Sequence, residues 1–418
     1  MSKSTEHQLH LIVIGGGLAG LSAAIATSLA GHRCTVLEKA ASFHEVGAGL
    51  QLTPNSTRLL RRWGILDALA PVAVAPTSLS VRRFDGTRVL SRDERWQENM
   101  VRLYAAPFWD VHRVDLHAAM LERARELGVL IRTGAEVEDI DFTAASVTLS
   151  GSQERVVGDV VLAADGLWSR ARGLLFSRPV PPAPTGDLAY RIILKIEDLQ
   201  HDPELAQWVE RPTVNFWVGP QSHVVGYSVR AGKEFNLVLL CPDSLPEGCS
   251  RASADIDEMR ELFKGWDPIL TRFLNCVKAV DKWRLMHFPS LQTWNHESGR
   301  FTMAGDSCHP MLPYLAQGAN SAMEDGAVLG RLLGSVRQAA DIPRVLGVYE
   351  KLRKERVEEV AKQALKQRWD FHLPDGPQQE ARDKIMAREQ PSISEYPSRW
   401  TCPKVQPWLF GYDAMASA

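Results

Sequence analysis

A chain of 418 residues is long enough for two or three domains around a large buried core. With 45% hydrophobic and 23% charged residues, the composition is that of a soluble globular protein, and the formal net charge of -2 argues against a basic nucleic-acid-binding surface. The six cysteines form no Cys-x-x-Cys pair, so neither a zinc site nor a disulfide framework is indicated. A reducing compartment, the cytoplasm, is therefore expected.

The first apolar stretch, residues 9–30, is interrupted by Gly15, Gly16, Gly17 and Gly20. Because of these glycines and the lack of a clear basic segment before them, neither a signal peptide nor a membrane anchor is expected. The pattern instead predicts a strand, a glycine turn and a small-residue helix, followed by a second strand over 33–37. Strand, helix and strand in this order predict a parallel βαβ unit with a right-handed crossover.

The glycines have the spacing Gly-x-Gly-x-x-Gly in the context that a dinucleotide-binding turn requires. Gly15 permits the tight turn, Gly17 lets a pyrophosphate approach the backbone, and Gly20 lets helix and strand pack closely. The helix N-terminus then faces the phosphates. Glu38 ends the second strand, where a carboxylate can accept hydrogen bonds from ribose hydroxyls. The motif alone leaves FAD and NAD both open.

Further along the chain, a helix begins at Pro54 and is stopped by Gly64, and Pro-rich residues 179–182 indicate a stiff linker. Before the linker the pattern predicts a helix over 114–127, short strands over 129–149 and a buried strand over 159–164. After it, period-two alternation predicts antiparallel strands over 188–196, 213–218, 223–229 and 235–241. Helical patterns then occupy 253–276, a strand occupies 300–304, and long helices occupy 319–335 and 343–372.

These elements predict an α/β fold in which a Rossmann-type domain is interleaved with an antiparallel-sheet domain and followed by C-terminal helices. The expected nucleotide-binding domain is discontinuous and comprises residues 1–77, 101–180 and 289–372. The expected substrate domain comprises residues 78–100 and 181–288. Residues 373–418, rich in Pro, Gln, Trp and Tyr, are expected to form an ordered irregular extension.

The stretch from 304 to 326 places Asp306, Ser307, Cys308 and His309 in consecutive positions. Consecutive residues in a turn do not usually adopt the geometry of a Ser-His-Asp triad. A zinc site would require more ligands than Cys308 and His309, so no metal is expected. The strand, Gly-Asp turn, proline, glycine loop and helix instead predict a backbone cradle for a cofactor.

Five ordered blocks of the chain resemble the motifs of single-component FAD-dependent aromatic hydroxylases, most closely the salicylate-hydroxylase-like branch. The resemblance covers most of the chain, to about residue 372. The blocks are the N-terminal glycine motif Gly15–Gly20, Gly47–Asn55, His112–Leu116, Asp159–Arg172, and Gly305–Pro310 with its continuation Gln317–Asp325. The resemblance is specific for the family but not for a substrate.

The resemblance implies a tightly bound FAD, with Glu38 on the ribose, Arg113 beside the FAD chain and Asp306 at the ribityl or pyrophosphate region. Asp165 and Gly166 would contact both FAD and NAD(P)H. The residues expected to bind the cofactor are Gly15, Gly17, Leu18, Ala19, Gly20, Glu38, Lys39, Gly49, Leu50, Arg113, Val137, Asp165, Gly166, Asp306, Pro310, Gly318, Ala319 and Asn320.

The same resemblance implies the reaction. NAD(P)H is a transient reductant, O₂ is a co-substrate, and oxygen is transferred from a flavin C4a-hydroperoxide to a phenolic or carboxylated aromatic molecule. No protein side chain activates O₂ unaided, so the cofactor must carry that step. The expected partner is this small aromatic substrate, with no nucleic acid and no transmembrane segment, and the protein is expected to be a monomer or homodimer.

Substrate contacts are expected on the antiparallel sheet. His223 and Tyr227 lie four residues apart on one strand, hence on the same face and roughly 13 Å apart. The resemblance gives these two residues, with Arg191, catalytic and substrate-binding roles, and adds Gln51 and Pro310 to the substrate contacts. Gln51 occupies a position where some relatives place a histidine near the ring, and this departure weakens any claim of a histidine base there.

Each of these side chains also has a structural interpretation: Tyr227 as a core aromatic, His223 as a strand-end histidine and Arg191 as an ion-pair partner. Two other functions stay open. An FAD-dependent epoxidase of an apolar or polyene substrate would need the same cofactor and a more apolar pocket. A flavin-binding redox sensor would bind FAD without turnover.

Overall fold

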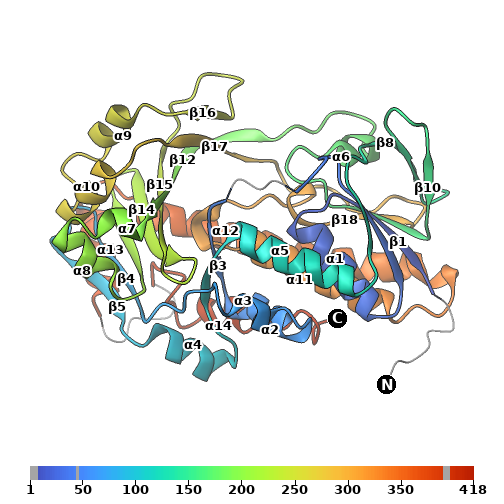
Figure 1. Cartoon of the computed structure of the whole chain (residues 1–418), viewed down its shortest axis with the longest axis horizontal. Coiled ribbons are helices and arrows are strands. Elements are labelled where there is room, and N and C mark those ends of the chain that lie inside the picture. The colour runs from blue at the N-terminus through green and yellow to red at the C-terminus, as the bar shows by residue number, and fades with distance from the viewer. Residues whose placement is uncertain (1–7, 44–46, 389–395) are drawn as a thin grey trace.

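The computed structural model describes residues 8–43, 47–388 and 396–418. One end of the molecule is built on a five-stranded parallel sheet, on the right of Figure 1. Its order is β18 (Phe301–Met303), β11 (Val160–Ala163), β1 (His10–Ile14), β2 (Arg33–Leu37) and β7 (Leu130–Arg132). Since β1 and β2 pair in parallel and α1 (Leu18–Leu29) joins them, the predicted βαβ unit is confirmed.

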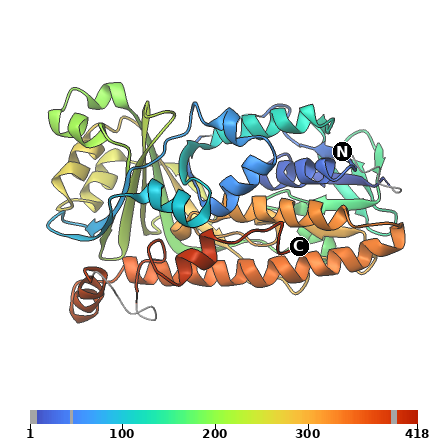
Figure 2. The same cartoon turned by 90° about the horizontal axis from the view of Figure 1, so that it is seen from below.

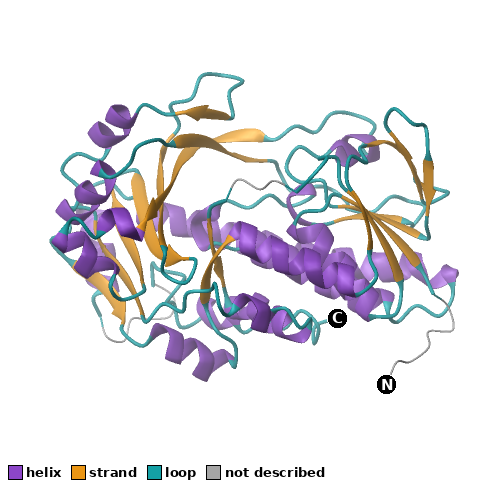
Figure 3. Cartoon of the chain, viewed as in Figure 1, coloured by secondary structure: helices purple, strands orange, loops and turns teal. Residues whose placement is uncertain are grey.

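The other end is an eight-stranded sheet, on the left of Figures 1 and 3. Its order is β16 (Arg251–Ser253), β17 (Asp281–His287), β12 (Ala183–Lys195), β15 (Glu234–Pro242), β14 (Ser222–Val229), β13 (Thr213–Gly219), β4 (Ser78–Arg83) and β5 (Val89–Asp93). The predicted α/β fold with a second, antiparallel sheet is therefore correct, although β4 pairs with β13 in parallel. The exact domain limits stay a prediction.

The two faces of this sheet pack against different cores because its strands alternate. On β14, Val224 belongs to a core with the outer helices, whereas Val225 and Tyr227 belong to a core on the inner side. The outer helices are α7 (Ile196–Leu199), α8 (Pro203–Val209), α9 (Ile256–Leu262) and α10 (Pro268–Asn275). The inner face is thus directed toward the rest of the molecule.

Two parallel helices distant in sequence lie side by side at the centre: α1 and α11 (Gly318–Leu333). Glycines on α11 allow the contact, since a Cβ on Gly326 would lie 2.5 Å from the Ala23 nitrogen and one on Gly330 would lie 2.5 Å from Ala26. The contacts of Gly326 and Gly330 have nearly the same offset in residue number between α11 and α1. Extending this offset toward the N-termini puts Ala322 opposite Leu18. Consequently α11 begins about one turn, roughly 6 Å, before α1.

The remaining elements connect these parts. β3 (Gly49–Leu52) pairs antiparallel with β6 (Trp109–His112), and a small sheet contains β10 (Arg155–Val157), β9 (Ser146–Leu149) and β8 (Val137–Asp141). The helices are α2 (Pro54–Arg62), α3 (Leu66–Leu69), α4 (Trp96–Tyr104), α5 (Arg113–Glu126), α6 (Arg170–Leu175) and α12 (Ile342–Phe371). Figure 2 shows α12 running along most of the molecule's length. None of the described helices is long and apolar enough to cross a bilayer.

The expectation of an irregular C-terminal extension was wrong for two segments. α13 (Pro377–Met386) and α14 (Val405–Phe410) are helices. Pro377 occupies the first turn of α13, where its fixed φ favours a helix start rather than a break. The Pro-rich composition alone predicts breaks in secondary structure. The position of Pro377 in the first turn instead allows a helix to begin there.

Candidate active site

The glycine turn after β1 has the geometry of a phosphate-binding turn. Gly15 has a φ of +103°, and a Cβ there would lie 2.4 Å from the Ala164 carbonyl oxygen. A Cβ on Gly20 would lie 2.0 Å from the Gly15 oxygen, whereas one on Gly17 would meet no atom within 4 Å. Gly15 and Gly20 are therefore needed for close packing, and Gly17 borders open space at the N-terminus of α1, beside Leu18 and Ala19.

Glu38 lies against this turn. One carboxylate oxygen accepts from the Gly16 N–H at 2.9 Å, and the other accepts from the Ala40 N–H at 2.9 Å. The next residue, Lys39, is exposed. Val137 is buried near the same end of β2, because the Ala135 N–H donates to the Glu38 carbonyl at 2.9 Å.

The N-terminus of α11 is the second open helix end. A Cβ on Gly318 would meet no atom within 4 Å, and Ala319 is only half-buried. The side chain of Asn320 is committed elsewhere, since its Nδ2 donates to the Gln51 carbonyl at 3.0 Å and its Oδ1 accepts from the Thr53 N–H at 3.2 Å. The first-turn amides, which lack intrahelical partners, are thus the groups that can face a ligand.

Asp306 lies in the short turn that follows β18. Its side chain is open to solvent, yet the protein around it raises the pKa of the carboxyl against the opposing charges of His309 and Arg113. The charge interaction with Arg113 shows that the two residues lie near each other, and we call the accessible space beside them the cleft. Arg113 begins α5, and its N–H donates to the Ala48 carbonyl at 3.0 Å, next to Gly49 and Leu50.

Arg191 on β12 belongs to the same cleft. Its side chain is exposed, yet surrounding protein lowers its pKa, and Arg113 adds to the lowering while Tyr227 opposes it. The guanidinium lies over the Trp283 ring at 5.4 Å from the centroid. Asp306, Arg113 and Arg191 come from three parts of the sequence, and the fold brings them to one space between the two sheets.

The loop after β11 has one unused polar atom. Asp165 accepts from the Ala171 N–H at 3.0 Å through one oxygen, while its other oxygen is buried and has no hydrogen-bond partner among the described residues. Gly166 follows with a φ of +76°. Arg172 holds the loop through hydrogen bonds to the carbonyl oxygens of Leu167 at 2.8 Å and Ser307 at 2.9 Å.

The consecutive residues Ser307, Cys308 and His309 do not form a hydrolase site. The Ser307 hydroxyl donates to the Ala163 and Ala304 carbonyls at 2.9 and 2.7 Å. The His309 Nε2 lies 2.5 Å from an Asp325 oxygen, and burial raises the pKa of the Cys308 thiol. These contacts are structural. No cluster of three potential metal ligands occurs within residues 8–43, 47–388 and 396–418.

Arg191 and Tyr227 share the inner face of the large sheet. The register aligns Arg191 with Val238 and Val238 with Val225, and Tyr227 lies two residues beyond Val225 on β14. Tyr227 is 3% exposed, and burial raises its pKa. The structure therefore brings together two of the residues expected to contact a substrate.

His223 shares this face but lies in a different environment. Its Nδ1 is 2.7 Å from the Nε2 of His372, and Tyr314 and Phe371 pack against its ring. Burial lowers the pKa of His223 well below its usual range and that of His372 to about 3, so this pair is neutral at pH 7. The structure thus assigns His223 contacts within the core, and its catalytic role stays a prediction.

Gln51 and Pro310, the other two residues expected to contact a substrate, lie in different surroundings. Gln51 is buried, and its Nε2 donates to an Asp110 oxygen at 3.1 Å. Pro310 is half-buried and borders an apolar groove of about 530 Å³ against α12, together with Trp294 and Trp369. Asp110 was missed from the sequence. Its pairing with Gln51 follows from the β3–β6 ladder, which short segments 60 residues apart do not reveal.

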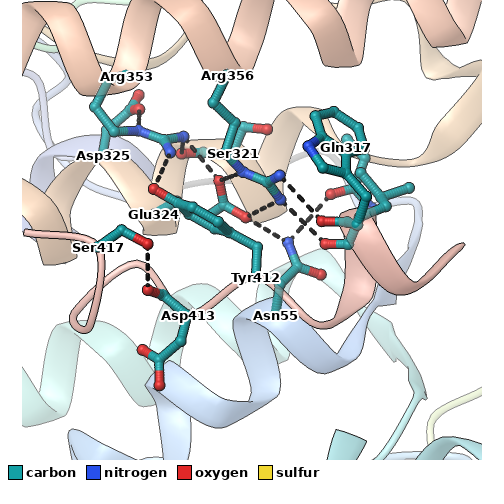
Figure 4. A network of polar contacts seen from close by, with 12 residues as sticks. Asn55, Gln317, Ser321, Glu324, Asp325, Arg353, Arg356, Tyr412, Asp413 and Ser417 are labelled. Atoms are coloured by element: carbon teal, nitrogen blue, oxygen red, sulfur yellow. Dashed lines mark hydrogen bonds and ion pairs between the residues drawn. The ribbon is translucent and has the colours of Figure 1, made fainter. Parts of the chain in front are cut away.

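A buried charged network supports the cradle from behind (Figure 4). On α11, Glu324 pairs with Arg353 and Arg356 at 2.9 and 2.8 Å, and Asp325 pairs with Arg353 at 2.7 Å. The Asp325 carboxylate also accepts from the Gly305 N–H at 2.9 Å. Burial opposes ionisation, but the cations outweigh it and keep the pKa values of both carboxyls below their usual range.

These observations fit an elongated dinucleotide cofactor. Two helix N-termini open on the same side of the central helices, each beside a glycine where a Cβ would meet open space. A carboxylate lies at each part of the cradle: Glu38 by the glycine turn, and Asp306 with Arg113 in the cleft. The fold and site together define a class of dinucleotide-binding protein with a second sheet domain.

The comparisons with known proteins agree. The FAD binding domain family matches residues 8–364. The chain is 70% identical over 416 residues to FAD-dependent monooxygenase OpS4 of Beauveria bassiana, covering 99% of this chain and 97% of the relative. It is 36% identical over 421 residues to 3-amino-4-hydroxybenzoate 2-monooxygenase PtnB3 of Streptomyces platensis, covering 99% and 98%. A salicylate hydroxylase substrate complex superposes with a TM-score of 0.80 and 25% identity over 100% and 98% of the chains.

The chain therefore belongs to the FAD binding domain family and to the FAD-dependent monooxygenases of the aromatic-hydroxylase type. The resemblance drawn from the five sequence blocks is confirmed.

Proposed function

We propose that this protein uses NAD(P)H and O₂ to hydroxylate a phenolic or carboxylated aromatic substrate. The observation that supports this best is the pairing of an exposed arginine, Arg191, with a buried tyrosine, Tyr227, on the sheet face that borders the cradle cleft. A guanidinium suits a phenolate or carboxylate, since both are anions that accept its hydrogen bonds. Relatives named for hydroxybenzoates, such as 3-hydroxybenzoate 6-hydroxylase of Polaromonas naphthalenivorans, 31% identical, support the same substrate class.

In this proposal the FAD, held by the residues already assigned to the cradle, supplies the redox chemistry and the activation of O₂. The chain's own task is to position and to polarise. The first-turn amides of α11 stabilise negative charge at the part of the cofactor that they face. Arg191 orients the substrate anion, and Tyr227 offers a hydroxyl for a second hydrogen bond. The walls of the cleft limit the access of water to the reacting atoms.

The test is a panel of phenols and aromatic acids incubated with the FAD-loaded protein. NADH and NADPH consumption, O₂ uptake and product mass are all measured, because release of peroxide alone would also consume NAD(P)H. The expected result is a product that has gained one oxygen atom, or that has gained one oxygen atom and lost one CO₂ and is therefore lighter than the substrate, formed with one equivalent of NAD(P)H. If no phenol or aromatic acid stimulates both oxygen uptake and product formation, the proposal is refuted.

Two alternatives predict different results in the same assay. An epoxidase would leave the aromatic panel untouched and add oxygen to an apolar alkene. A redox sensor would bind FAD and show no substrate-stimulated consumption of NAD(P)H. The exposed charge of Arg191 favours hydroxylation of an anionic aromatic over epoxidation, because a guanidinium gains no charge-assisted hydrogen bond from an apolar ligand.

We propose that the protein is located in the cytoplasm. This agrees with its six cysteines, which are all free thiols in the structure. The protein is proposed to be a monomer or homodimer, and sedimentation of the FAD-loaded form distinguishes the two.

A further inference from the structure

A buried carboxyl that the proposed roles do not use lies beneath the substrate face. Asp110, on β6, is 0% exposed. One of its oxygens accepts from the Gln51 Nε2 at 3.1 Å, and the other is buried without a hydrogen-bond partner among the described residues. Buried polar atoms are nearly always paired, so an unpaired carboxyl oxygen calls for a specific explanation.

Strand pairing places Asp110 on the side where Tyr227 lies. Gly49 pairs with His112 and Gln51 with Asp110, so these alternate residues share one face of the β3–β6 ladder. Tyr227 packs directly against Gly49, because a Cβ there would lie 2.8 Å from the Tyr227 hydroxyl oxygen. β14 also runs beside β6, as the 3.3 Å contact between Arg230 and His112 shows.

The ionisable side chains around Asp110 form two separate groups. Tyr227 faces it from β14, and the cation that acts on Tyr227 is Arg191 on β12. At the far end of the β3–β6 ladder, His112 lies with Arg230, Glu234 and Asp115 in a separate charged group. Within the part of the chain that the structure describes, no arginine, lysine or histidine bonds to the Asp110 carboxyl.

The burial of Asp110 affects both its pKa and the way in which it can exchange a proton. Burial raises its pKa well above the usual range, and the hydrogen bond from Gln51 only partly opposes this. A carboxyl of this kind exchanges its proton closer to neutral pH than an exposed one, as a general base requires. The side chain is fully buried, so it has to act through a neighbour. Tyr227 is close enough for the charge of Asp110 to raise its pKa, although no hydrogen bond joins these two side chains in the structure.

We propose that Asp110 is the proton acceptor for the phenolic hydroxyl of the substrate, with the Tyr227 hydroxyl between the two. The inference rests on the proposed function, since it requires a phenol in the cleft. The substrate O–H bond breaks as its proton passes to the Tyr227 oxygen, and the Tyr227 proton passes to the unpaired Asp110 oxygen. A phenolate and a neutral carboxylic acid result, with no change in oxidation state.

The direction of this transfer is favoured by the surroundings. Before the transfer, the negative charge lies on a buried carboxylate to which no described cation bonds. Afterwards it lies on the substrate, beside the exposed guanidinium of Arg191. A phenolate ring is also more electron-rich than a phenol ring, so the transfer prepares the carbon that accepts oxygen. Asp110 is thus a positioning residue for the proton that acts through Tyr227.

The test compares the parent with Asp110→Asn, which keeps the shape of the side chain and removes the carboxyl. The FAD-loaded proteins are titrated with 4-hydroxy-3-nitrobenzoate, whose phenolate is yellow, across a range of pH. The parent should bind this probe as the phenolate at pH values where the free probe is still a phenol. Asp110→Asn should shift that ionisation at least one pH unit upward and lower kcat for the best phenol of the panel about 10²- to 10⁴-fold.

A double-mutant cycle checks the path through Tyr227. If the proton passes through both groups, Tyr227→Phe in an Asp110→Asn background should slow turnover by less than threefold, because the path is already broken. Asp257→Asn, an exposed carboxyl with 88% of its side-chain area accessible, is the matched control and should change nothing.

Three outcomes would overturn the assignment: a parent that does not bind the probe as phenolate, an Asp110→Asn protein with the parent's probe ionisation, or fully additive effects of the two substitutions. Each is distinct from failure of the proposed function, in which the parent itself oxidises no phenol. A folding defect of the Asp110→Asn protein is recognised separately, from the pH dependence of its stability. Because burial raises the pKa of Asp110 in the folded protein, Asp110→Asn should gain stability relative to the parent as pH rises.

Discussion

Replacing Gly17 by alanine separates binding of the cofactor from stability of the fold. Gly17 is the N-cap of α1 with a φ of -76°, which alanine adopts without strain, and a Cβ there meets no protein atom within 4 Å. Loss of glycine at an N-cap should lower the free energy of unfolding by less than about 1.5 kcal/mol. The added methyl group instead occupies the open space where a pyrophosphate would approach the helix end.

The expected loss of affinity follows from the hydrogen bonds that the methyl group displaces. Two backbone amides donating to charged phosphate oxygens contribute about 1.5–3 kcal/mol each, so Gly17→Ala should weaken FAD binding by about 3–6 kcal/mol. This corresponds to a factor of about 10² to 10⁴ in Kd. The measurement is a titration of FAD-free protein with FAD, followed by flavin fluorescence, together with thermal unfolding of the same FAD-free protein.

Two further glycines provide the comparison. In Gly20→Ala the Cβ would lie 2.0 Å from a backbone oxygen, so both the stability of the FAD-free protein and its FAD affinity should fall. Gly347 is exposed within α12 with open space around it, so Gly347→Ala should stabilise by about 1 kcal/mol and leave FAD binding unchanged. A Gly17→Ala protein that binds FAD within threefold of the parent would refute the assignment of this turn to the phosphates.

Three other predictions concern the cradle and the cleft. Arg353→Met leaves Glu324 and Asp325 buried with fewer cations and should lower the free energy of unfolding by about 3–5 kcal/mol; urea denaturation measures this, and a loss below about 1 kcal/mol contradicts it. Asp306→Ala should release FAD on gel filtration, whereas Ser307→Ala should keep its activity, in contrast to a hydrolase. Arg191→Ala and Tyr227→Phe should retain FAD and hydroxylate more slowly; parent rates with the true substrate in both variants would show that the substrate face is misassigned.

The parts of the fold that local patterns determine were predictable. The glycine turn, the βαβ unit and the alternation that places His223 and Tyr227 on one sheet face all follow from neighbours in sequence. The shared face of Arg191 and Tyr227 does not, because it depends on the pairing of β12 and β14 with β15. Asp110 was not predictable, because its environment depends on the pairing of β6 with β3 and on Tyr227 from β14. A carboxylate between Trp109 and Val111 gives no local sign that it will be buried.

His223 illustrates the opposite case. Its alternation with Tyr227 correctly predicted a shared face, but the face is covered differently along the strand. At His223 it meets His372, at the end of α12, while Tyr227 lies near the cleft. Which part of a sheet face is open depends on helices about 150 residues further along the chain. The alternation of residues within one strand does not predict where these helices pack.

The contact of α1 with α11 also has a consequence for the order of events in the cell. The two helix ends of the cradle are about 300 residues apart in the chain, and the arginines behind α11 are held in turn by the C-terminal segment. Arg356 donates to the Leu409 carbonyl at 3.0 Å and lies 3.7 Å from the centre of the Tyr412 ring. A ribosome must therefore release nearly the whole chain before the cradle is complete. We therefore expect FAD to bind after translation, and a chain truncated near residue 400 should lose flavin although every cradle residue is present.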